Sequence, residues 1–126
     1  MKAAELRIGN WISTIEGPVQ VTAMSHEGLM ATSIMTGGDL LGWAEPITIT
    51  NEWLVKFGFE VDVLCRDVFY IPYQAGYLTV CTGNYEHTGF VKDKGDMVLY
   101  ISFGDIKYVH QLQNLYFALT EKELTV

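Results

Sequence analysis

Turn signals divide the first 49 residues of this 126-residue chain into short segments, and this constrains the fold more than any other feature. Beginning with residues 6–8, runs of apolar and small polar side chains are separated by glycine, proline and polar residues at positions 16–18, 26–28 and 37–39. Such alternation is typical of half-buried strands, and Gly and Pro mark the turns between them. Short strands at roughly ten-residue spacing predict a small, curled, SH3-like sheet.

Residues 51–57 carry the first helix signal. Thr50 is a good N-cap residue. Glu52 and Lys56 are spaced i, i+4, so they suit the two ends of the helix dipole and can pair on the exposed side. Gly58 suits the left-handed residue that commonly follows a helix. These signals agree, and they predict a short helix.

Residues 60–104 return to strand-like runs that are rich in aromatic and β-branched side chains. The runs at 68–73 and 77–82 flank Gln74-Ala75-Gly76, and a three-residue loop containing Gly predicts a hairpin. Two further strands are predicted in this region, at 61–65 and 97–103, and residues 85–96 are predicted to form a polar loop.

A second helix is predicted over residues 106–119, with Asp105 as its cap and a last helical turn at 120–123. Apolar residues at spacings of three and four give it one apolar face: Val109, Leu112, Leu115, Tyr116 and Leu119. A second row on roughly the opposite side indicates that the helix is covered twice, by another part of the chain or by another chain. This row is the candidate interaction surface: Ile106, His110, Gln113 and Phe117.

Neutral hydrogen-bonding side chains crowd onto the same helix: His110, Gln111, Gln113 and Asn114. Polar groups beside a buried seam usually bond to backbone at loop ends, and they can equally position a partner at an interface. We favour the structural role, because polar groups near a core normally need partners within the fold.

Together these elements predict a β-rich α+β fold, with a small SH3-like amino-terminal sheet and an antiparallel sheet flanked by two helices. The first subdomain is expected over residues 1–49, and the second, an α+β unit, over residues 50–126. No Ser- or Pro-rich linker separates them. We therefore expect the two subdomains to pack together, with the long carboxy-terminal helix across one sheet face.

Composition and charge exclude several classes of protein. Apolar residues at 49% and charged residues at 18% exclude a disordered chain. A net charge of −7 disfavours nucleic-acid binding, which needs clustered Lys and Arg. The longest uncharged stretch, residues 68–85, contains Pro and Gly, so no membrane association is expected. With no signal-peptide run, and with Cys65 and Cys81 too few for a disulfide framework, the sequence favours a cytoplasmic protein.

No set of reactive side chains forms a recognisable catalytic pattern. The three histidines and two thiols lack metal-ligand spacing, so neither a metal nor another cofactor is expected. No nucleophile with a base and no desolvated carboxylate pair is evident, so no catalytic residue is assigned and enzymatic activity is not expected. Tyr70, Tyr73 and Tyr77 are the candidate ligand platform, although packing in the core is favoured for them.

Three segments carry a family resemblance: residues 6–11 (LRIGNW), 46–59 (PITITNEWLVKFGF) and 106–120 (IKYVHQLQNLYFALT). They resemble a family of small uncharacterised proteins that is common in Bacteroides-group bacteria and in their phages and mobile elements. The resemblance implies a bacterial or phage-encoded cytosolic protein. It implies no activity, cofactor or catalytic residue, because none is established for that family.

We therefore expect a non-enzymatic protein-interaction module that binds a protein partner or forms a homodimer. One alternative is a small-molecule-binding protein or hydrolase with a pocket between the lobes. The other is an acidic antagonist that mimics nucleic acid. That role needs acids gathered on one surface, whereas the charge is spread as −3 over residues 1–50 and −4 over residues 51–126.

Overall fold

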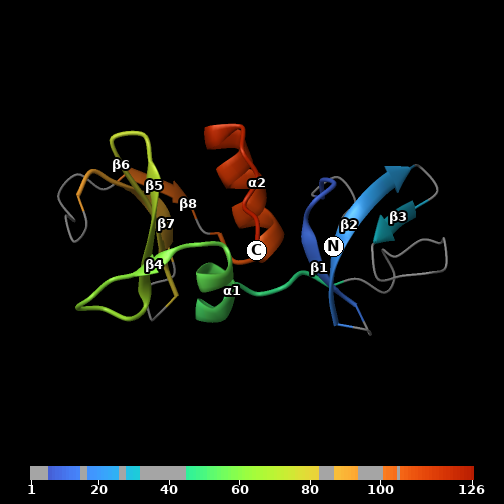
Figure 1. The fold of residues 1–126 in the computed structure, drawn as a ribbon, viewed down its shortest axis with the longest axis horizontal. Helices are drawn as coiled ribbons and strands as arrows, with labels where there is room; N and C mark the ends of the chain where they lie inside the picture. The colour runs from blue at the N-terminus through green and yellow to red at the C-terminus, as the bar shows by residue number, and fades with distance from the viewer. Residues whose placement is uncertain are drawn as a thin grey trace. The chain divides into compact units, whose positions relative to one another are not determined.

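The computed structural model describes residues 6–14, 17–25, 28–31, 45–82, 87–93, 101–104 and 106–126. Within these residues it contains two antiparallel sheets and two helices, so the predicted β-rich α+β fold is confirmed (Figure 1). The chain divides into two compact units, Met1–Thr48 with Tyr108–Glu123 and Ile49–Lys107 with Leu124–Val126. The carboxy-terminal helix groups with the amino-terminal strands, whereas the predicted second subdomain included it. The reason is that an amide side chain of this helix bonds to the backbone just before and at the start of the first strand.

The first unit contains a sheet of three described strands, β1 (Trp11–Thr14), β2 (Gly17–Ser25) and β3 (Gly28–Ala31), in the order β1-β2-β3. Neighbouring strands are antiparallel, and Ile12 of β1 lies opposite Val19 of β2, with both side chains buried. The register shifts between Val21 and Ala23, a β-bulge of the kind that bends a strand. The short strand expected after the turn signal at residues 37–39 lies outside the described residues, at 40–43.

Residues 6–10 form a turn, so the strand predicted at residues 6–8 is wrong. Asn10 N donates to Arg7 O at 3.1 Å, and Gly9 N donates to Val21 O at 2.8 Å. Gly9 has a φ of 98°, a left-handed conformation that costs glycine little because it has no Cβ. Only the bond between Asn10 and Arg7 is local, whereas Gly9 N and Asn10 O both bond to Val21, so the turn is attached to β2.

Helix α2 (Val109–Thr120) begins three residues later than predicted. Its N-cap residue is Tyr108, whose N–H donates to Gln111 Oε1 at 3.1 Å, and Val109 N donates to Ile47 O at 2.8 Å. The predicted cap, Asp105, lies outside the described residues.

The predicted last helical turn at residues 120–123 does not form. Glu121 takes a left-handed φ of 61° and ends α2, with its N–H donating to Phe117 O at 2.7 Å. Thr120 Oγ1 donates to Tyr116 O and accepts from Lys122 N, which turns the chain away from the helix axis. Glu123 is thereby placed beside Arg7 of the same unit.

The second unit contains helix α1 (Asn51–Lys56), and the predictions for its two ends are confirmed. Thr50 Oγ1 accepts from Trp53 N at 3.3 Å, and Lys56 Nζ lies 3.3 Å from Glu52 Oε1. Gly58 follows the helix with a φ of 90°. The helix buries two of its residues, and the segment after it buries two more aromatic side chains: Trp53, Leu54, Phe57 and Phe59.

The sheet of the second unit has five described strands in chain order: β4 (Glu60–Val61), β5 (Val68–Tyr73), β6 (Gly76–Cys81), β7 (His87–Val91) and β8 (Ile101–Gly104). All neighbours are antiparallel (Figure 1). Phe69, Val80 and Thr88 lie opposite one another on β5, β6 and β7, and all three are buried. Residues that lie opposite one another share a face, so this row packs one face of the sheet. Tyr70 and Thr79 lie opposite each other on the other face and are also buried.

The hairpin between β5 and β6 forms with a two-residue turn, Gln74-Ala75, so the predicted three-residue loop is wrong. Gly76 is the first residue of β6 and pairs with Tyr73. A Cβ on Gly76 would overlap Val91 O and would lie 2.7 Å from the ring of Phe90. Glycine is therefore required here by close packing against β7.

We expect Gly76→Ala to lower the free energy of unfolding by about 1–2 kcal/mol, because the backbone carbonyl of Val91 has to move. Urea unfolding followed by circular dichroism measures this change. Ala75→Ser in the adjacent exposed turn is the matched control, with an expected change within about 0.5 kcal/mol. Equal effects of the two substitutions would contradict the close packing of Gly76.

Candidate interaction site

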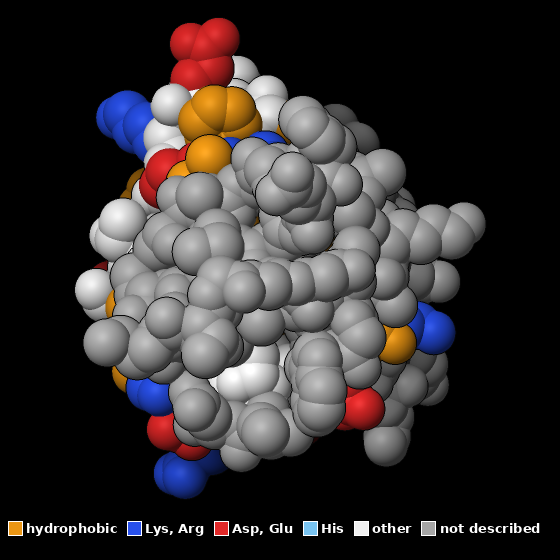
Figure 2. All heavy atoms as spheres, turned by 90° about the vertical axis from the view of Figure 1, so that its right-hand side faces the viewer, with side chains coloured by type: hydrophobic (Ala, Val, Ile, Leu, Met, Phe, Trp, Pro, Cys, Tyr) orange, Lys and Arg blue, Asp and Glu red, His pale blue; other side chains and the backbone are white. Residues whose placement is uncertain are grey.

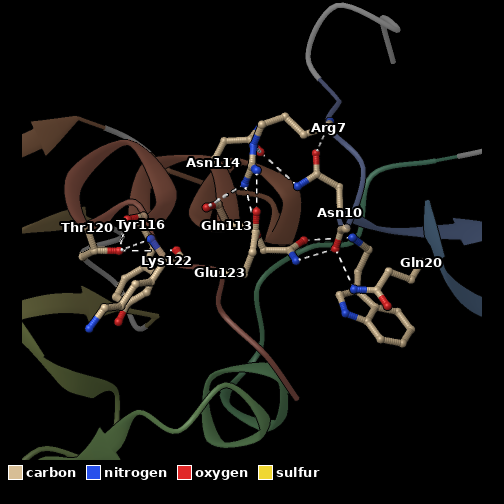
Figure 3. Close-up of polar contacts among 11 residues, drawn as sticks. Arg7, Asn10, Gln20, Gln113, Asn114, Tyr116, Thr120, Lys122 and Glu123 are labelled. Atoms are coloured by element: carbon tan, nitrogen blue, oxygen red, sulfur yellow. Dashed lines mark hydrogen bonds and ion pairs between the residues drawn. The ribbon is translucent and has the colours of Figure 1, made fainter. Parts of the chain in front are cut away.

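Polar side chains from the two ends of the first unit bond to one another (Figure 3). We call this set the clamp; it contains Arg7, Asn10, Gln113, Asn114 and Glu123. Its first two residues belong to the turn before β1, the next two to α2, and the last to the segment that follows α2. The clamp therefore joins segments separated by about a hundred positions in the sequence.

Gln113 is the buried centre of the clamp, with no exposed surface. Its Nε2 donates to Gly9 O at 2.9 Å, and its Oε1 accepts from Trp11 N at 2.8 Å. Gln20 Nε2 also donates to Gly9 O, from β2. Because both ends of the Gln113 amide bond to backbone, this side chain fixes α2 against the start of β1.

Asn10 and Asn114 continue the clamp. Asn10 Oδ1 accepts from Arg7 N at 2.6 Å, which closes the turn, and Asn10 Nδ2 donates to Asn114 Oδ1 at 2.9 Å. Asn10 is fully buried, so these bonds satisfy a side chain that would otherwise destabilise the core.

Arg7 covers the solvent side of the clamp. Its Nε donates to Asn114 Oδ1 at 2.8 Å, its Nη1 lies 2.7 Å from Glu123 Oε1, and the guanidinium lies 4.3 Å from the ring centroid of Phe117. Nη2 adds longer bonds to Gln113 O and to Glu123 Oε2, both at 3.3 Å. A planar guanidinium is suited to this combination of bidentate pairing and stacking.

The residues predicted as an interaction surface therefore do not form one exposed row. His110 and Gln113 are buried, and the His110 ring stacks on Tyr108 at 6.0 Å. Phe117 is exposed in part, with Arg7 over its ring, and Ile106 belongs to the second unit. The structural role favoured for the polar residues of this helix is what Gln113 and Asn114 perform.

The three tyrosines of the predicted ligand platform lie on both faces of the second sheet. Tyr70 and Tyr77 share one face, where their rings meet edge-on at 5.9 Å. Tyr73 lies on the other face, where its ring meets Phe90 at 5.8 Å. Tyr70 is buried, and its hydroxyl donates to Asp62 Oδ2 at 3.0 Å, so its role is packing and support.

The segment after β4 is the feature that the sequence analysis missed. A strand was predicted over 61–65, but only Glu60–Val61 is a strand, and residues 62–65 form a tight loop. Asp62 Oδ1 accepts from Leu64 N at 2.8 Å and from Cys65 N at 3.1 Å, and these bonds replace a strand ladder. A side-chain carboxylate two residues before such an N–H is the signal for this turn.

Val63 and Leu64 stand at the end of this loop, and we call them the apolar tip. Their exposed fractions are 95% and 94%, so neither side chain is covered by the residues that the structure describes. Val55 and Val61, also exposed, at 60% and 47%, belong to the same stretch of sequence. Exposed apolar side chains that are clustered and held in a fixed conformation indicate a contact site for another molecule.

Asp62 connects the apolar tip to the sheet. One carboxylate oxygen holds the loop backbone, and the other accepts the hydroxyl of Tyr70 from β5. Asp62 N donates to Val68 O at 2.8 Å, and Val68 N donates to Cys65 O at 3.2 Å, so the loop is closed at its base. The tip is therefore presented in a defined conformation.

The edge of the sheet beside the tip offers little room for another strand. The backbone C=O of Val68 accepts from Asp62 N, on the β4 side of β5. Backbone groups alternate in direction along a strand, so the backbone groups of Tyr70 and Pro72 also face the β4 side. Tyr70 is already opposite Glu60, and Pro72 has no N–H to donate. Proline at such an edge blocks pairing with a further strand.

The two cysteines are free thiols in different surroundings. Cys65 is exposed beside the apolar tip, while Cys81 on β6 is half-buried. Burial, with smaller contributions from Cys65 and Asp67, raises the pKa of the Cys81 thiol to about 11 from its ordinary 9.0. Cys81 is therefore a poor source of thiolate near neutral pH.

We expect iodoacetamide at mildly basic pH to alkylate Cys65 before Cys81. The raised pKa lowers the thiolate population of Cys81 about a hundredfold compared with a thiol of ordinary pKa. A more basic thiolate is also a better nucleophile, which recovers about tenfold of the rate. We therefore expect Cys81 to be labelled about tenfold more slowly. Mass spectrometry of the digested protein measures both rates. In concentrated guanidinium the two rates should converge, and equal rates in the folded protein would contradict the protected setting of Cys81.

The described part of the chain has neither a cluster of metal-binding side chains nor a membrane-spanning helix. No group of three or more His, Cys, Asp or Glu side chains lies close enough there to hold a metal ion. None of the described helices has the length and apolar character needed to cross a membrane. In Figure 2, the described acidic and basic side chains that can be seen lie close to one another at the rim of the face.

Comparison with known proteins gives no relative. No family model matches the chain, and neither does any curated protein or solved structure.

Proposed function

We propose that this chain is a non-enzymatic protein-interaction module of a bacterial or phage-encoded system, and that it binds a protein partner through the apolar tip. The observation that carries the proposal is the nearly complete exposure of Val63 and Leu64 on a loop whose backbone is held by Asp62. Burying a Val or Leu side chain contributes about 1.5–3 kcal/mol, so this pair can anchor an interface.

The way the tip is held adds to this argument. Ordering a loop on binding costs free energy, and a loop already fixed in the free protein avoids much of that cost. Asp62 supplies this order through three hydrogen bonds, two to the loop backbone and one from Tyr70. A few well-placed apolar anchors carry most of the affinity of a typical interface, so two residues are sufficient for a contact centre.

The mode of binding follows from the adjacent edge. Pro72 and the short β4 limit strand addition, so the partner receives the tip side chains in a pocket. The cytoplasm is the compartment we propose, because Cys65 and Cys81 are both free thiols and the family resemblance points to cytosolic bacterial and phage proteins.

The test is a photo-crosslinking amino acid at position 64, in cells that encode the chain, with the same group at exposed position 122 as the matched control. We expect a discrete crosslinked protein from position 64 and none from position 122. A crosslinker at position 63 combined with Leu64→Ser should give at least about fivefold less product, because one of two anchors is lost. Identical products from positions 64 and 122, or no product from position 64, would refute the proposal.

A further inference from the structure

We infer that Cys65 and Cys81 are a redox-active thiol pair, which reacts with a small-molecule disulfide such as oxidised glutathione to form an intramolecular disulfide. Both residues belong to the second unit, Cys65 at the end of the loop that bears the apolar tip and Cys81 at the end of β6. Both lie next to one residue of β5, Val68. The reaction does not require the partner proposed above.

Cys81 lies directly opposite Val68 on the neighbouring strand. Both backbone groups of Val68 bond on the β4 side, where its N–H donates to Cys65 O at 3.2 Å and its C=O accepts from Asp62 N at 2.8 Å. Val68 and Cys81 are therefore a pair without hydrogen bonds between them, the type in which the Cα atoms lie about 4.5 Å apart and the side chains are close. Their side chains share one face of the sheet.

Cys65 reaches the same face from the β4 side. It begins a β-turn that ends at Val68, and the Cα atoms at the two ends of such a turn lie within about 7 Å. Tyr70, two residues after Val68, points to the same face, and its hydroxyl places the Asp62 carboxylate there by donating to Oδ2 at 3.0 Å. Asp62 Oδ1 accepts from Cys65 N at 3.1 Å, so the Cys65 backbone is held over the face that carries Cys81.

The two thiols also interact electrostatically. Burial is the main cause of the raised pKa of the Cys81 thiol, and Cys65 is the next, ahead of Asp67. A like charge disfavours ionisation in this way when it lies near by, so the two thiols are neighbours in the fold. The Cys65 side chain is exposed, which leaves it free to turn toward the half-buried Cys81 and makes it the thiol that meets a dissolved disulfide first.

The bond forms through two thiol–disulfide exchanges. The Cys65 thiolate attacks one sulfur of oxidised glutathione, which gives a mixed disulfide and releases one glutathione. The Cys81 thiolate then attacks the Cys65 sulfur, which forms the Cys65–Cys81 bond and releases the second glutathione. Two protein thiols are oxidised, one glutathione disulfide is reduced, and the two protons pass to the glutathione thiolates. The raised pKa of Cys81 makes the second exchange the slow one, and the product ties the loop that bears the apolar tip to β6.

The experiment equilibrates the full chain with mixtures of reduced and oxidised glutathione, blocks the remaining thiols with N-ethylmaleimide and maps the products by mass spectrometry. Trypsin places Cys65 and Cys81 on separate peptides, residues 57–66 and 67–92, because it cleaves after Arg66. We expect these peptides to be linked in the monomeric protein and to be separated by dithiothreitol. At one glutathione ratio, the ratio of linked to reduced protein should be at least about tenfold higher in the folded chain than in concentrated guanidinium, because the fold holds the thiols together.

Single substitutions give the matched controls, with circular dichroism to confirm that each variant is folded. Cys81→Ala should stop the reaction at the mixed disulfide on Cys65. Cys65→Ser should give no linked peptides, and glutathione should add to Cys81 at least about tenfold more slowly than to Cys65 of the wild type. Glutathione on Cys65 alone in the wild type, a bond between two chains, or a linked fraction no larger in the folded than in the unfolded protein would overturn the inference and leave the proposed function intact.

Discussion

Replacing Gln113 with leucine is expected to lower the free energy of unfolding by about 3 kcal/mol. The side chain keeps a similar size, but Trp11 N loses its acceptor and Gly9 O loses one of its two donors, both on half-buried residues that face a fully buried side chain. Leaving a buried polar group without its partner costs about 1–3 kcal/mol, and two partly buried groups are affected here. Urea unfolding followed by circular dichroism measures the change.

Gln20→Leu is the matched control for this experiment. Gln20 bonds to the same carbonyl, Gly9 O, but makes this one bond and is only half-buried. Its loss should cost about 1 kcal/mol, the contribution of an ordinary hydrogen bond. If Gln113→Leu cost no more than Gln20→Leu, the clamp would not hold α2 to the amino-terminal turn.

Arg7→Leu is the second large effect, and we expect it to cost about 2–3 kcal/mol. The substitution removes the charged bonds to Asn114 and Glu123 and the stacking over Phe117. Hydrogen bonds to charged groups contribute about 1.5–3 kcal/mol each, but partial exposure of the Arg7–Glu123 pair screens its share. The same urea unfolding experiment measures this cost, and the loss should shrink at high salt.

A double-mutant cycle separates the contributions at Arg7. Glu123→Gln alone should cost about 0.5–1 kcal/mol, and it should cost almost nothing in the Arg7→Leu background, because the pair is already broken. Arg7→Lys should recover only part of the loss, since an ammonium group cannot bond Asn114 and Glu123 in the planar geometry of Arg7. Full rescue by lysine would show that charge alone matters.

Local signals were sufficient for the elements whose causes are local. Thr50, Glu52, Lys56 and Gly58 predicted the ends of α1, and each makes the contact or takes the conformation expected of it. The hairpin between β5 and β6 was predicted for the same reason, although its turn is one residue shorter than expected. The need for Gly76 comes from Val91 and Phe90 on β7, which no local pattern contains.

The role of the polar residues on α2 depends on partners about a hundred positions away. The sequence shows Gln113 and Asn114 as polar groups near an apolar face, but not that their partners are Gly9, Trp11 and Asn10. Only the fold joins these two segments, the turn before β1 and α2, so no local pattern in either of them predicts the clamp.

The apolar tip was missed because alternation in Val61-Asp62-Val63 fits a strand as well as a turn. Strand propensity favours Val at these positions, whereas the Asp62 carboxylate stabilises a turn by accepting two backbone N–H groups. The Tyr70 hydroxyl of β5 also donates to the second carboxylate oxygen, which helps to orient the carboxylate toward the turn. That contact depends on the pairing of β4 with β5, which the sequence does not specify by itself.

The most direct test of the account is amide hydrogen exchange at Leu64 and Cys65 in the free protein. If Asp62 holds the apolar tip in one conformation, both amides should exchange at least about tenfold more slowly than in an unstructured peptide, although the Leu64 side chain is almost fully exposed. Asp62→Ala should remove this protection and leave the amides of β6 protected. Exchange of Leu64 and Cys65 at the unstructured rate in the wild type would contradict the claim that the chain presents a fixed contact site.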